Sequence, residues 1–264
     1  TMALHVETTG DGPDLVLLHG WGLHGGVWHG LARELAPAFR VHLVDLPGHG
    51  HSRALPFGSL DAVADAVAAV VPAGAALCGW SLGGLVAMRL ASRHARRLRA
   101  IALVSTTPCF ARRDDWPHAM ARGTLEDFAA GLRDDPARTI RTFVNLNALG
   151  GPHARDRMRE LAALLVERGN PSAESLAAGL AVLHDEDLRD EAAAIDLPAA
   201  VIHGARDALV PAGAGRWLAA ALPFARYTEI AEAAHLPFVS HCAEVAQALR
   251  HLAGGESGRK LAHG

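Results

Sequence analysis

The chain has 264 residues, of which half are hydrophobic and 20% are charged, and its formal net charge is −3. A length near 250 suits a single α/β unit with a large core, and the slightly acidic balance provides no basic field for nucleic acid. No stretch reaches the roughly 18 uninterrupted apolar residues of a membrane helix, and the first residues lack the charged-then-apolar pattern of a leader, so we expect a soluble cytoplasmic protein.

Short apolar runs bounded by Gly, Pro or polar residues predict six β-strands. In chain order they are 15–19, 41–45, 75–78, 101–105, 199–203 and 227–230. Amphipathic segments of helical length lie between most of them, for example at 60–71 and 85–94, and another at 243–252 follows the last strand. Apolar strands that alternate with helices are typical of a mostly parallel sheet covered on both faces, so the expected fold class is α/β.

The alternation stops between about Thr107 and Leu197. This interval predicts four helices, at 125–133, 136–149, 154–168 and 172–184, separated by Gly, Pro and Asn. An all-helical insertion of this kind suggests a cap over the edge of the sheet. We expect 1–107 and 198–254 to form the core, 108–197 to form the cap and 255–264 to be a disordered tail.

The three cysteines, Cys78, Cys109 and Cys242, are widely spaced and form no C-x-x-C pair. Their odd number argues against a disulfide framework, and their spacing argues against a zinc site. Cys78 is either a reactive thiol or, as we expect from its apolar run, a buried small hydrophobe. The sixteen histidines are scattered and form no metal-binding helix pair, so no metal is expected.

The most informative motif is the G-x-S-x-G pentapeptide at 79–83, which lies between an apolar run and a helix-like segment. Its glycines allow a sharp strand-to-helix turn that leaves the Ser81 hydroxyl exposed above a helix N-terminus. In a chain with 27 glycines the bare pattern also arises by chance. The strand before it, the helix after it, and later acid and base candidates favour Ser81 as a nucleophile.

An acid and a base follow Ser81 in the order Ser, Asp, His. Asp207 comes just after the predicted strand 199–203, and His235 follows the last predicted strand. Both therefore fall at the sheet edge where the serine turn also lies. Other candidates remain: His203 and His241 as bases, and Asp185 and Asp187 as acids. Chain order and strand-end placement favour Asp207 and His235.

Acyl transfer also needs donors for the oxyanion. The backbone N–H of Leu82 follows the nucleophile, and the HGWG segment at 19–22 offers the N–H of Trp21 as a second donor. The alternative for HGWG is a plain turn that carries a core tryptophan.

Together these motifs resemble the α/β-hydrolase fold across nearly the whole chain. The segments that carry the resemblance are HGWG at 19–22, DLPGHGHS at 45–52, GWSLGGL at 79–85, HGARD at 203–207 and AHLPF at 234–238. More narrowly, the chain resembles the pimeloyl-[acyl-carrier protein] methyl ester esterases of biotin synthesis. That likeness rests on LLHGWGL at 17–23, GWSLGGLVA at 79–87, the PCF and DWP triplets at 108–110 and 115–117, and FVSH at 238–241.

The resemblance implies a serine esterase that cleaves the methyl ester of an acyl chain held on an acyl carrier protein, with no metal or organic cofactor. It also implies that Trp21, Leu82 and a cap segment line the substrate site. This segment comprises Phe143, Val144, Asn145, Leu146 and Asn147. The alternative is an ordinary helix that buries Phe143 and Leu146. Asn147 stands where the family also has Gln, and its shorter side chain puts this contact in doubt.

A group of arginines in the predicted cap suggests how an acidic carrier protein would bind. Arg138 and Arg141 share one helix face, as do Arg155 and Arg159, with Arg157 close by. Basic side chains at a pocket mouth attract and orient an acidic partner. The alternative is a solvated helix face without a partner.

Two further hypotheses about function remain open. One keeps the triad but changes the substrate, giving a general short-chain carboxylesterase or a hydrolase of carbon–carbon bonds. The other is a binding module that holds a ligand without turnover. Enzymes of this fold that use an aspartate nucleophile are disfavoured by Ser81. We expect a monomer that binds neither nucleic acid nor membranes.

Overall fold

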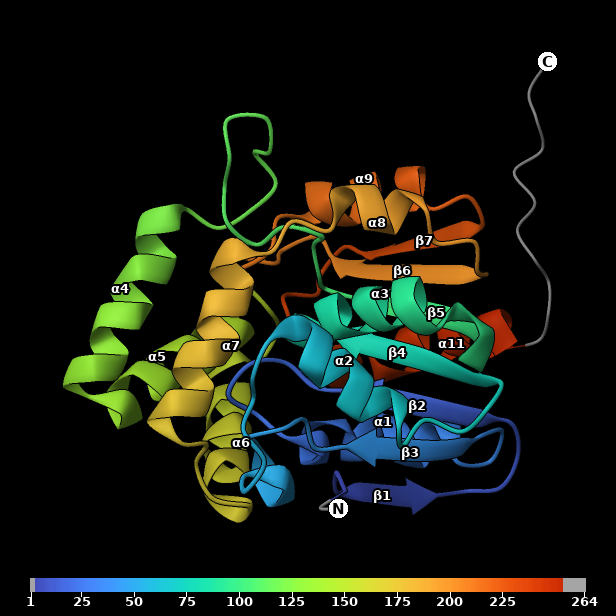
Figure 1. Cartoon of the computed structure of the whole chain (residues 1–264), viewed down its shortest axis with the longest axis horizontal. Helices are drawn as coiled ribbons and strands as arrows, with labels where there is room; N and C mark the ends of the chain where they lie inside the picture. The colour runs from blue at the N-terminus through green and yellow to red at the C-terminus, as the bar shows by residue number, and fades with distance from the viewer. Residues whose placement is uncertain (1–2, 254–264) are drawn as a thin grey trace.

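The computed structural model describes residues 3–253, so the tail expected at 255–264 lies outside the described residues. Its centre is a sheet with strand order β1-β3-β2-β4-β5-β6-β7 (Figure 1). The strands are β1 Val6–Thr9, β2 Asp14–Leu18, β3 Arg40–Val44, β4 Ala75–Trp80, β5 Leu98–Val104, β6 Ala199–Gly204 and β7 Ala225–Ile230. Apart from β1, which runs antiparallel to β3, neighbouring strands are parallel. The expected α/β class and mostly parallel sheet are confirmed.

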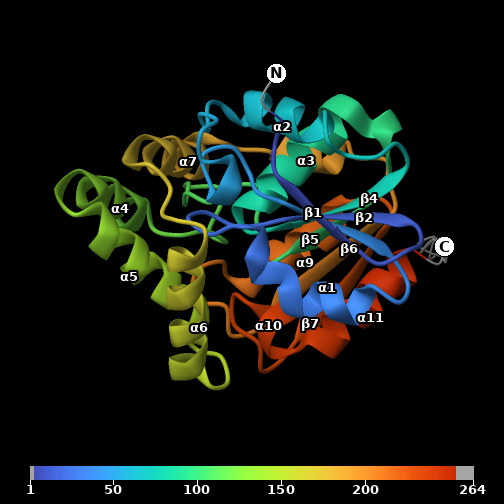
Figure 2. The ribbon, with the colours of Figure 1, turned by 90° about the horizontal axis from the view of Figure 1, so that it is seen from below.

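The central strands are buried because helices cover both faces of the sheet. Every residue of β4 is buried, as are four of the five residues of β2. Helices α2 (Leu60–Ala68) and α3 (Leu82–His94) pack on one face, and α1 (His29–Leu35) and α11 (Cys242–Ala253) lie on the other (Figure 2). Continuous apolar strands are stable only in such a three-layer arrangement.

Several elements differ from the sequence-based expectation. Strand β1 was not predicted, because its sequence VETT is polar and only its first residue is half-buried. Helix α3 begins at Leu82, directly after the serine, rather than at 85, and α2 ends at Ala68 rather than 71. Four further helices were not predicted: α1, α8 (Arg189–Ala193), α9 (Ala212–Ala221) and the short α10 (Pro237–Ser240). Three short 3-10 helices, Gly25–Trp28, Gly50–Ser52 and Ala95–Arg97, complete the described elements.

The interval expected to form the cap contains four long helices. They are α4 Arg122–Asp134, α5 Pro136–Ala148, α6 Ala154–Glu167 and α7 Ala173–Asp185, close to the predicted bounds. Figure 1 shows them gathered beside the end of the sheet toward which β3 points. Among residues 3–253, no helix is long and apolar enough to cross a membrane.

Candidate active site

Ser81 occupies a strained turn between β4 and α3. Its backbone has φ 54° and ψ −120°, a conformation that a non-glycine residue adopts at an energetic cost. The flanking glycines make the turn possible, because a Cβ on Gly79 would meet the carbonyl oxygen of Gly83 and a Cβ on Gly83 would lie 2.5 Å from that of Leu18. Strand-to-helix turns of this shape present a nucleophile at the sheet edge. Ser81 is nevertheless buried, so the exposure expected from the sequence is not found; residues packed over the turn cover it.

Hydrogen bonds from the neighbouring strand hold the turn in place. The Ser81 N–H donates to the Val104 carbonyl oxygen at 3.1 Å. The Thr106 hydroxyl donates to the Ser81 carbonyl oxygen at 2.7 Å. The backbone of Ser81 is therefore fixed on both sides by the fold.

His235 and Asp207 meet at the same sheet edge. The Nδ1 atom of His235 lies 2.7 Å from Oδ2 of Asp207, and both side chains are buried. Trp80, the residue before the serine, donates from its indole Nε1 to the carbonyl oxygen of His235 at 2.8 Å. The Nε2 atom of His235 has no hydrogen-bond partner among the described residues. The loop that carries His235 is thus tied to the loop that carries Ser81.

The environment of Asp207 keeps its carboxyl group ionised. Burial acts to raise its pKa, but His235, His203 and the hydrogen bonds they supply outweigh burial and hold the pKa well below its usual value. Its Oδ1 accepts the N–H groups of Leu209 and Val210, each at 2.9 Å. An ionised Asp207 can fix the orientation of the His235 ring and stabilise its protonated form.

The other acid and base candidates lie elsewhere. Asp187 forms an ion pair with Arg189 at 2.7 Å, and Asp185 lies 2.7 Å from its neighbour His184. His241 interacts with the Ser240 hydroxyl at 2.9 Å. The Nε2 atom of His203 lies 2.9 Å from the Val210 carbonyl oxygen and 3.5 Å from Asp207. Of the candidate acids, Asp207 is the one that reaches His235.

The two backbone N–H groups predicted to bind an oxyanion belong to the residue after Ser81 and to a loop that passes Ser81. Leu82 is the first residue of α3, and Trp21 lies in the loop after β2. Neither N–H donates a hydrogen bond within residues 3–253. A Cβ built on Gly20 would lie 3.2 Å from the Ser81 Cβ, so the HGWG loop passes directly beside the serine. This close approach distinguishes the segment from an ordinary turn.

Only some side chains of the segment 143–147 on α5 are buried. Phe143, Val144 and Asn147 are buried, Leu146 is half-buried and Asn145 is exposed. The Phe143 ring lies 4.7 Å from the Trp21 ring, so the segment meets the HGWG loop. The Asn147 amide donates to the Phe143 carbonyl oxygen at 2.8 Å, while its Oδ1 is buried without a partner in the described chain. Helical periodicity turns Asn145 away from this wall.

A buried polar network behind the HGWG loop was not predicted. The Nδ1 atom of His19 lies 2.8 Å from the Gly20 carbonyl oxygen, and Nε2 of His49 accepts the Gly22 N–H at 3.3 Å. Burial lowers the pKa of His19 to about 3 and that of His49 to about 4. These rings are therefore neutral hydrogen-bonding groups. In the sequence, these histidines could have been noticed because they lie within the HGWG and DLPGHGHS motifs.

The same network joins the core to the cap. Asp45 accepts the Gly25 N–H at 2.7 Å and forms an ion pair with Arg168, just after α6, at 3.1 Å. Arg168 also pairs with Glu7 on β1 at 2.7 Å. A buried guanidinium requires such acceptors, so Arg168 joins the end of α6 to the loop after β3 and to β1.

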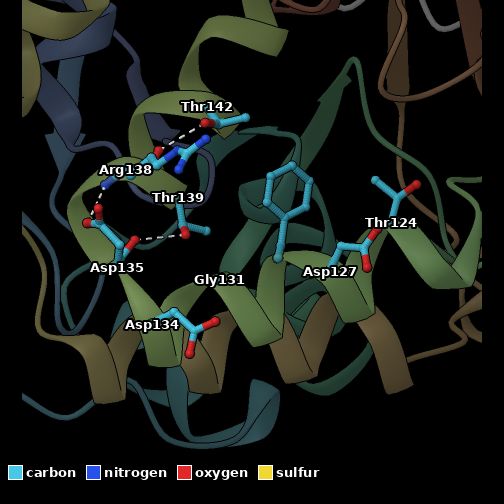
Figure 3. Close-up of a pocket in the computed structure, with 9 residues that line it drawn as sticks. Thr124, Asp127, Gly131, Asp134, Asp135, Arg138, Thr139 and Thr142 are labelled. Atoms are coloured by element: carbon cyan, nitrogen blue, oxygen red, sulfur yellow. Dashed lines mark hydrogen bonds between the residues drawn. The ribbon is translucent and has the colours of Figure 1, made fainter.

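The four arginines proposed for docking are all exposed, on α5 and α6. Arg159 pairs with Asp156 at 3.0 Å, and the half-buried Arg157 pairs with Glu160 at 2.7 Å. Arg138 differs from the others because it lines a hollow of about 410 Å³ between α4 and α5 (Figure 3). Asp127, Asp134 and Asp135 line the same hollow, so the field around Arg138 is partly cancelled.

Two of the three cysteines, Cys78 and Cys109, are buried, and Cys242 is half-buried. Cys78 is completely buried, and burial raises the pKa of its thiol, which confirms the expected small hydrophobe. All three cysteines are free. Among residues 3–253, no group of three His, Cys, Asp or Glu side chains is arranged to hold a metal ion.

The chain is similar to known proteins over most of its length. The profile of the Alpha/beta hydrolase family matches residues 15–248. The chain is 49% identical to a pimeloyl-[acyl-carrier protein] methyl ester esterase of Chromobacterium violaceum, over 94% of this chain and 97% of that protein. It is 44% identical to the protein of the same name from Nitrosomonas europaea, over 90% and 94%. Among solved structures, an esterase from Exiguobacterium antarcticum superimposes with a TM-score of 0.84 at 21% identity, covering 95% of each chain.

Proposed function

Because the chain belongs to the alpha/beta hydrolase family and, within it, to the pimeloyl-[acyl-carrier protein] methyl ester esterases, we propose that it hydrolyses the methyl ester of pimeloyl-acyl-carrier protein in biotin synthesis. The observation that carries this function is the 49% identity, which extends over almost the full length of both chains. The enzyme is a serine hydrolase acting on a carboxylic ester.

In the proposed mechanism, the Ser81 hydroxyl attacks the ester carbonyl carbon while His235 Nε2 takes its proton. Collapse of the tetrahedral intermediate expels methanol, which leaves with the proton returned by His235. Water then attacks the acyl-enzyme by the same route and releases the free carboxylic acid. The 2.7 Å contact between His235 and Asp207 supports these roles, because it leaves the opposite ring nitrogen facing the reaction.

The oxyanion of each intermediate would be held by the N–H groups of Trp21 and Leu82. Support comes from the approach of the HGWG loop to Ser81 and from the absence of other acceptors for these two donors in the described chain. The buried side chains of Phe143, Val144 and Asn147, with Leu146 at their edge, would face the acyl chain. Asn145 is exposed and would contribute through the helix backbone rather than through its side chain.

The acyl carrier protein would dock on α5 and α6, with Arg141, Arg155 and Arg159 as the principal contacts. Arg141 and Arg155 form no ion pair within residues 3–253, so their charge is available to an acidic partner. Arg138 would contribute less, because three aspartates share its hollow (Figure 3). Docking here would present the ester to the buried site under the cap.

The remaining parts of the proposal concern the setting of the enzyme. We place it in the cytoplasm, where free thiols persist, and all three of its cysteines are free. We also propose that it acts as a monomer and binds no nucleic acid, in keeping with its small negative net charge. The division into a core of 1–107 and 198–254 and a cap of 108–197 belongs to the same proposal.

The decisive experiment compares three substrates with purified protein: pimeloyl-acyl-carrier protein methyl ester, free monomethyl pimelate and p-nitrophenyl acetate. We expect the highest kcat/KM on the carrier-bound ester, with loss of the methyl group seen by mass spectrometry. Rapid turnover of the free esters alone would indicate a general carboxylesterase. If the protein hydrolysed none of these three esters but cleaved a substrate with a labile carbon–carbon bond, it would be a carbon–carbon bond hydrolase.

A fluorophosphonate probe separates an enzyme from a binding module. The wild-type protein should be labelled and Ser81→Ala should not, while both remain folded by circular dichroism. A wild-type protein that binds the carrier-bound ester but neither hydrolyses it nor reacts with the probe would be a binding module. In cells, the gene should restore growth without biotin to a strain that lacks its own methyl ester esterase, and Ser81→Ala should not.

A further inference from the structure

We propose that His203 is a positioning residue for the esterase reaction: its imidazole holds the loop 207–210 so that the Asp207 carboxylate stays against His235. This inference rests on the proposed function and adds a fourth side chain to its triad. His203 is completely buried at the end of β6, and its Nε2 faces Asp207 and the Val210 carbonyl oxygen, so its role would be exerted through the acid loop.

His203 contacts the loop 207–210 at two positions. Its Nε2 lies 2.9 Å from the Val210 carbonyl oxygen and 3.5 Å from Asp207 Oδ2. Val210 in turn donates its N–H to Asp207 Oδ1 at 2.9 Å. The peptide groups on both sides of Val210 are therefore fixed, one by His203 and the other by Asp207. The loop closes into a ring of contacts around the carboxylate.

The protonation state of His203 follows from its partners. A carbonyl oxygen and a carboxylate only accept hydrogen bonds, so Nε2 must carry the proton. Nδ1 is buried and has no partner in the described chain, so it has no acceptor for a second proton. His203 thus donates from Nε2 toward the acid loop, and both histidines next to Asp207 direct a nitrogen at Oδ2.

The cost of this arrangement indicates that the donor is needed. A buried acceptor without a partner is unfavourable, and an apolar side chain of similar size would avoid this penalty. Helix α9 also has a glycine where it faces the ring. A Cβ on Gly215 would lie 2.7 Å from His203 Nδ1, so a larger residue would crowd the imidazole. The protein thus has a polar imidazole at position 203 and a glycine at position 215, although an apolar side chain at 203 would avoid the unpaired nitrogen.

A pair of nearly isosteric substitutions tests the donor alone. His203→Gln places an amide N–H near the position of Nε2, whereas His203→Met has a similar volume and no donor. With p-nitrophenyl acetate, we expect His203→Met to lower kcat by about 10- to 100-fold, the range found when outer supporting partners of a site are removed. KM should change less than about twofold, and His203→Gln should recover most of kcat. The matched control is the same pair at His42, a buried histidine on β3 that contacts Asp14 at 2.7 Å away from the site; neither substitution there should change kcat.

A second background separates positioning from simple stabilisation. If His203 acts through Asp207, His203→Met should have little further effect on kcat in an Asp207→Asn protein. Equal losses in both backgrounds, an unchanged kcat with a lower melting temperature, or a folded His203→Gln as slow as His203→Met would each overturn the inference. Should His203→Met fail to fold, Gly215→Ala provides the test, because it displaces the ring without removing the donor and should also lower kcat. A wild-type protein without ester turnover would overturn the proposed function, whereas normal turnover in His203→Met would overturn this inference alone.

Discussion

The Nδ1 atom of His19 lies 2.8 Å from the carbonyl oxygen of Gly20, the oxygen of the same peptide group whose N–H belongs to Trp21. In a trans peptide the C=O and N–H point in opposite directions. By holding the Gly20 oxygen, His19 keeps the Trp21 N–H on the opposite side of this peptide, in the loop that passes Ser81. The ring is fixed in turn because its Nε2 accepts the Leu46 N–H at 2.9 Å.

This relationship predicts that His19 supports oxyanion binding. His19→Phe keeps an aromatic ring but removes the hydrogen bond to Gly20. We expect kcat on p-nitrophenyl acetate to fall by up to about 10²- to 10³-fold, the loss seen when one oxyanion donor is removed, with a smaller change in KM. Steady-state kinetics at neutral pH measure this effect. Turnover within twofold of wild type in a folded variant would show that the peptide orientation does not depend on His19.

Asp207→Asn should reduce kcat by about 10⁴, because the amide cannot stabilise protonated His235 and favours the wrong tautomer of its ring. The melting temperature should change little, since Asn retains an oxygen for the N–H groups of Leu209 and Val210. Asp187→Asn is the matched control, because that carboxylate pairs with Arg189 away from His235. A loss below about tenfold at Asp207 would argue against its role as the orienting acid.

Charge reversal on the cap should affect only the carrier-bound ester. Arg155→Glu should lower kcat/KM on pimeloyl-acyl-carrier protein methyl ester more than Arg138→Glu, because the aspartates around Arg138 already offset its charge. The wild-type constant should also fall as salt rises. Hydrolysis of monomethyl pimelate serves as the control and should barely change. Equal losses on both substrates would mean that the arginines support the cap itself, and no loss on either would leave them as a solvated face.

The buried histidines predict a loss of stability in mild acid. In the unfolded chain a histidine has a pKa of about 6.5, whereas burial lowers the pKa of His19 to about 3 and that of His49 to about 4. Above pH 6.5 both states are neutral and these groups contribute no pH dependence. As the pH falls from about 6.5 toward 4, the unfolded chain binds protons that the folded protein cannot, so the free energy of unfolding decreases.

Urea denaturation at several pH values between 7 and 4.5 measures this dependence. His49→Gln should reduce the slope of unfolding free energy against pH by up to about 1.4 kcal/mol per pH unit, the value for one proton. The window ends near pH 4.5 because the carboxylate of Asp45, whose pKa is also lowered, begins to contribute below it. An identical slope in wild type and His49→Gln would contradict the neutral state of this ring.

Much of the fold was predictable because it depends on local patterns. Apolar runs identified the six parallel strands, and glycine spacing identified the turn at Ser81, since a close backbone approach needs glycine whatever the rest of the chain does. Strand β1 escaped notice because its polar sequence gains its pairing only from β3. Its hydrogen bonds depend on a partner more than 30 residues away, which no local pattern records.

The sequence by itself determined the class of the fold, the strand-to-helix turn at Ser81 and the order of acid and base after it, because each follows from short-range periodicity or from where parallel strands end. Only the tertiary structure decided which acid reaches His235, that His203 contacts this acid, and that Arg168 binds Asp45 across 123 residues. It also decided that Arg138 lies among aspartates. Hydrogen bonds and ion pairs of this kind join residues far apart in the chain, and their energies depend on burial and distance that arise only when the layers have packed.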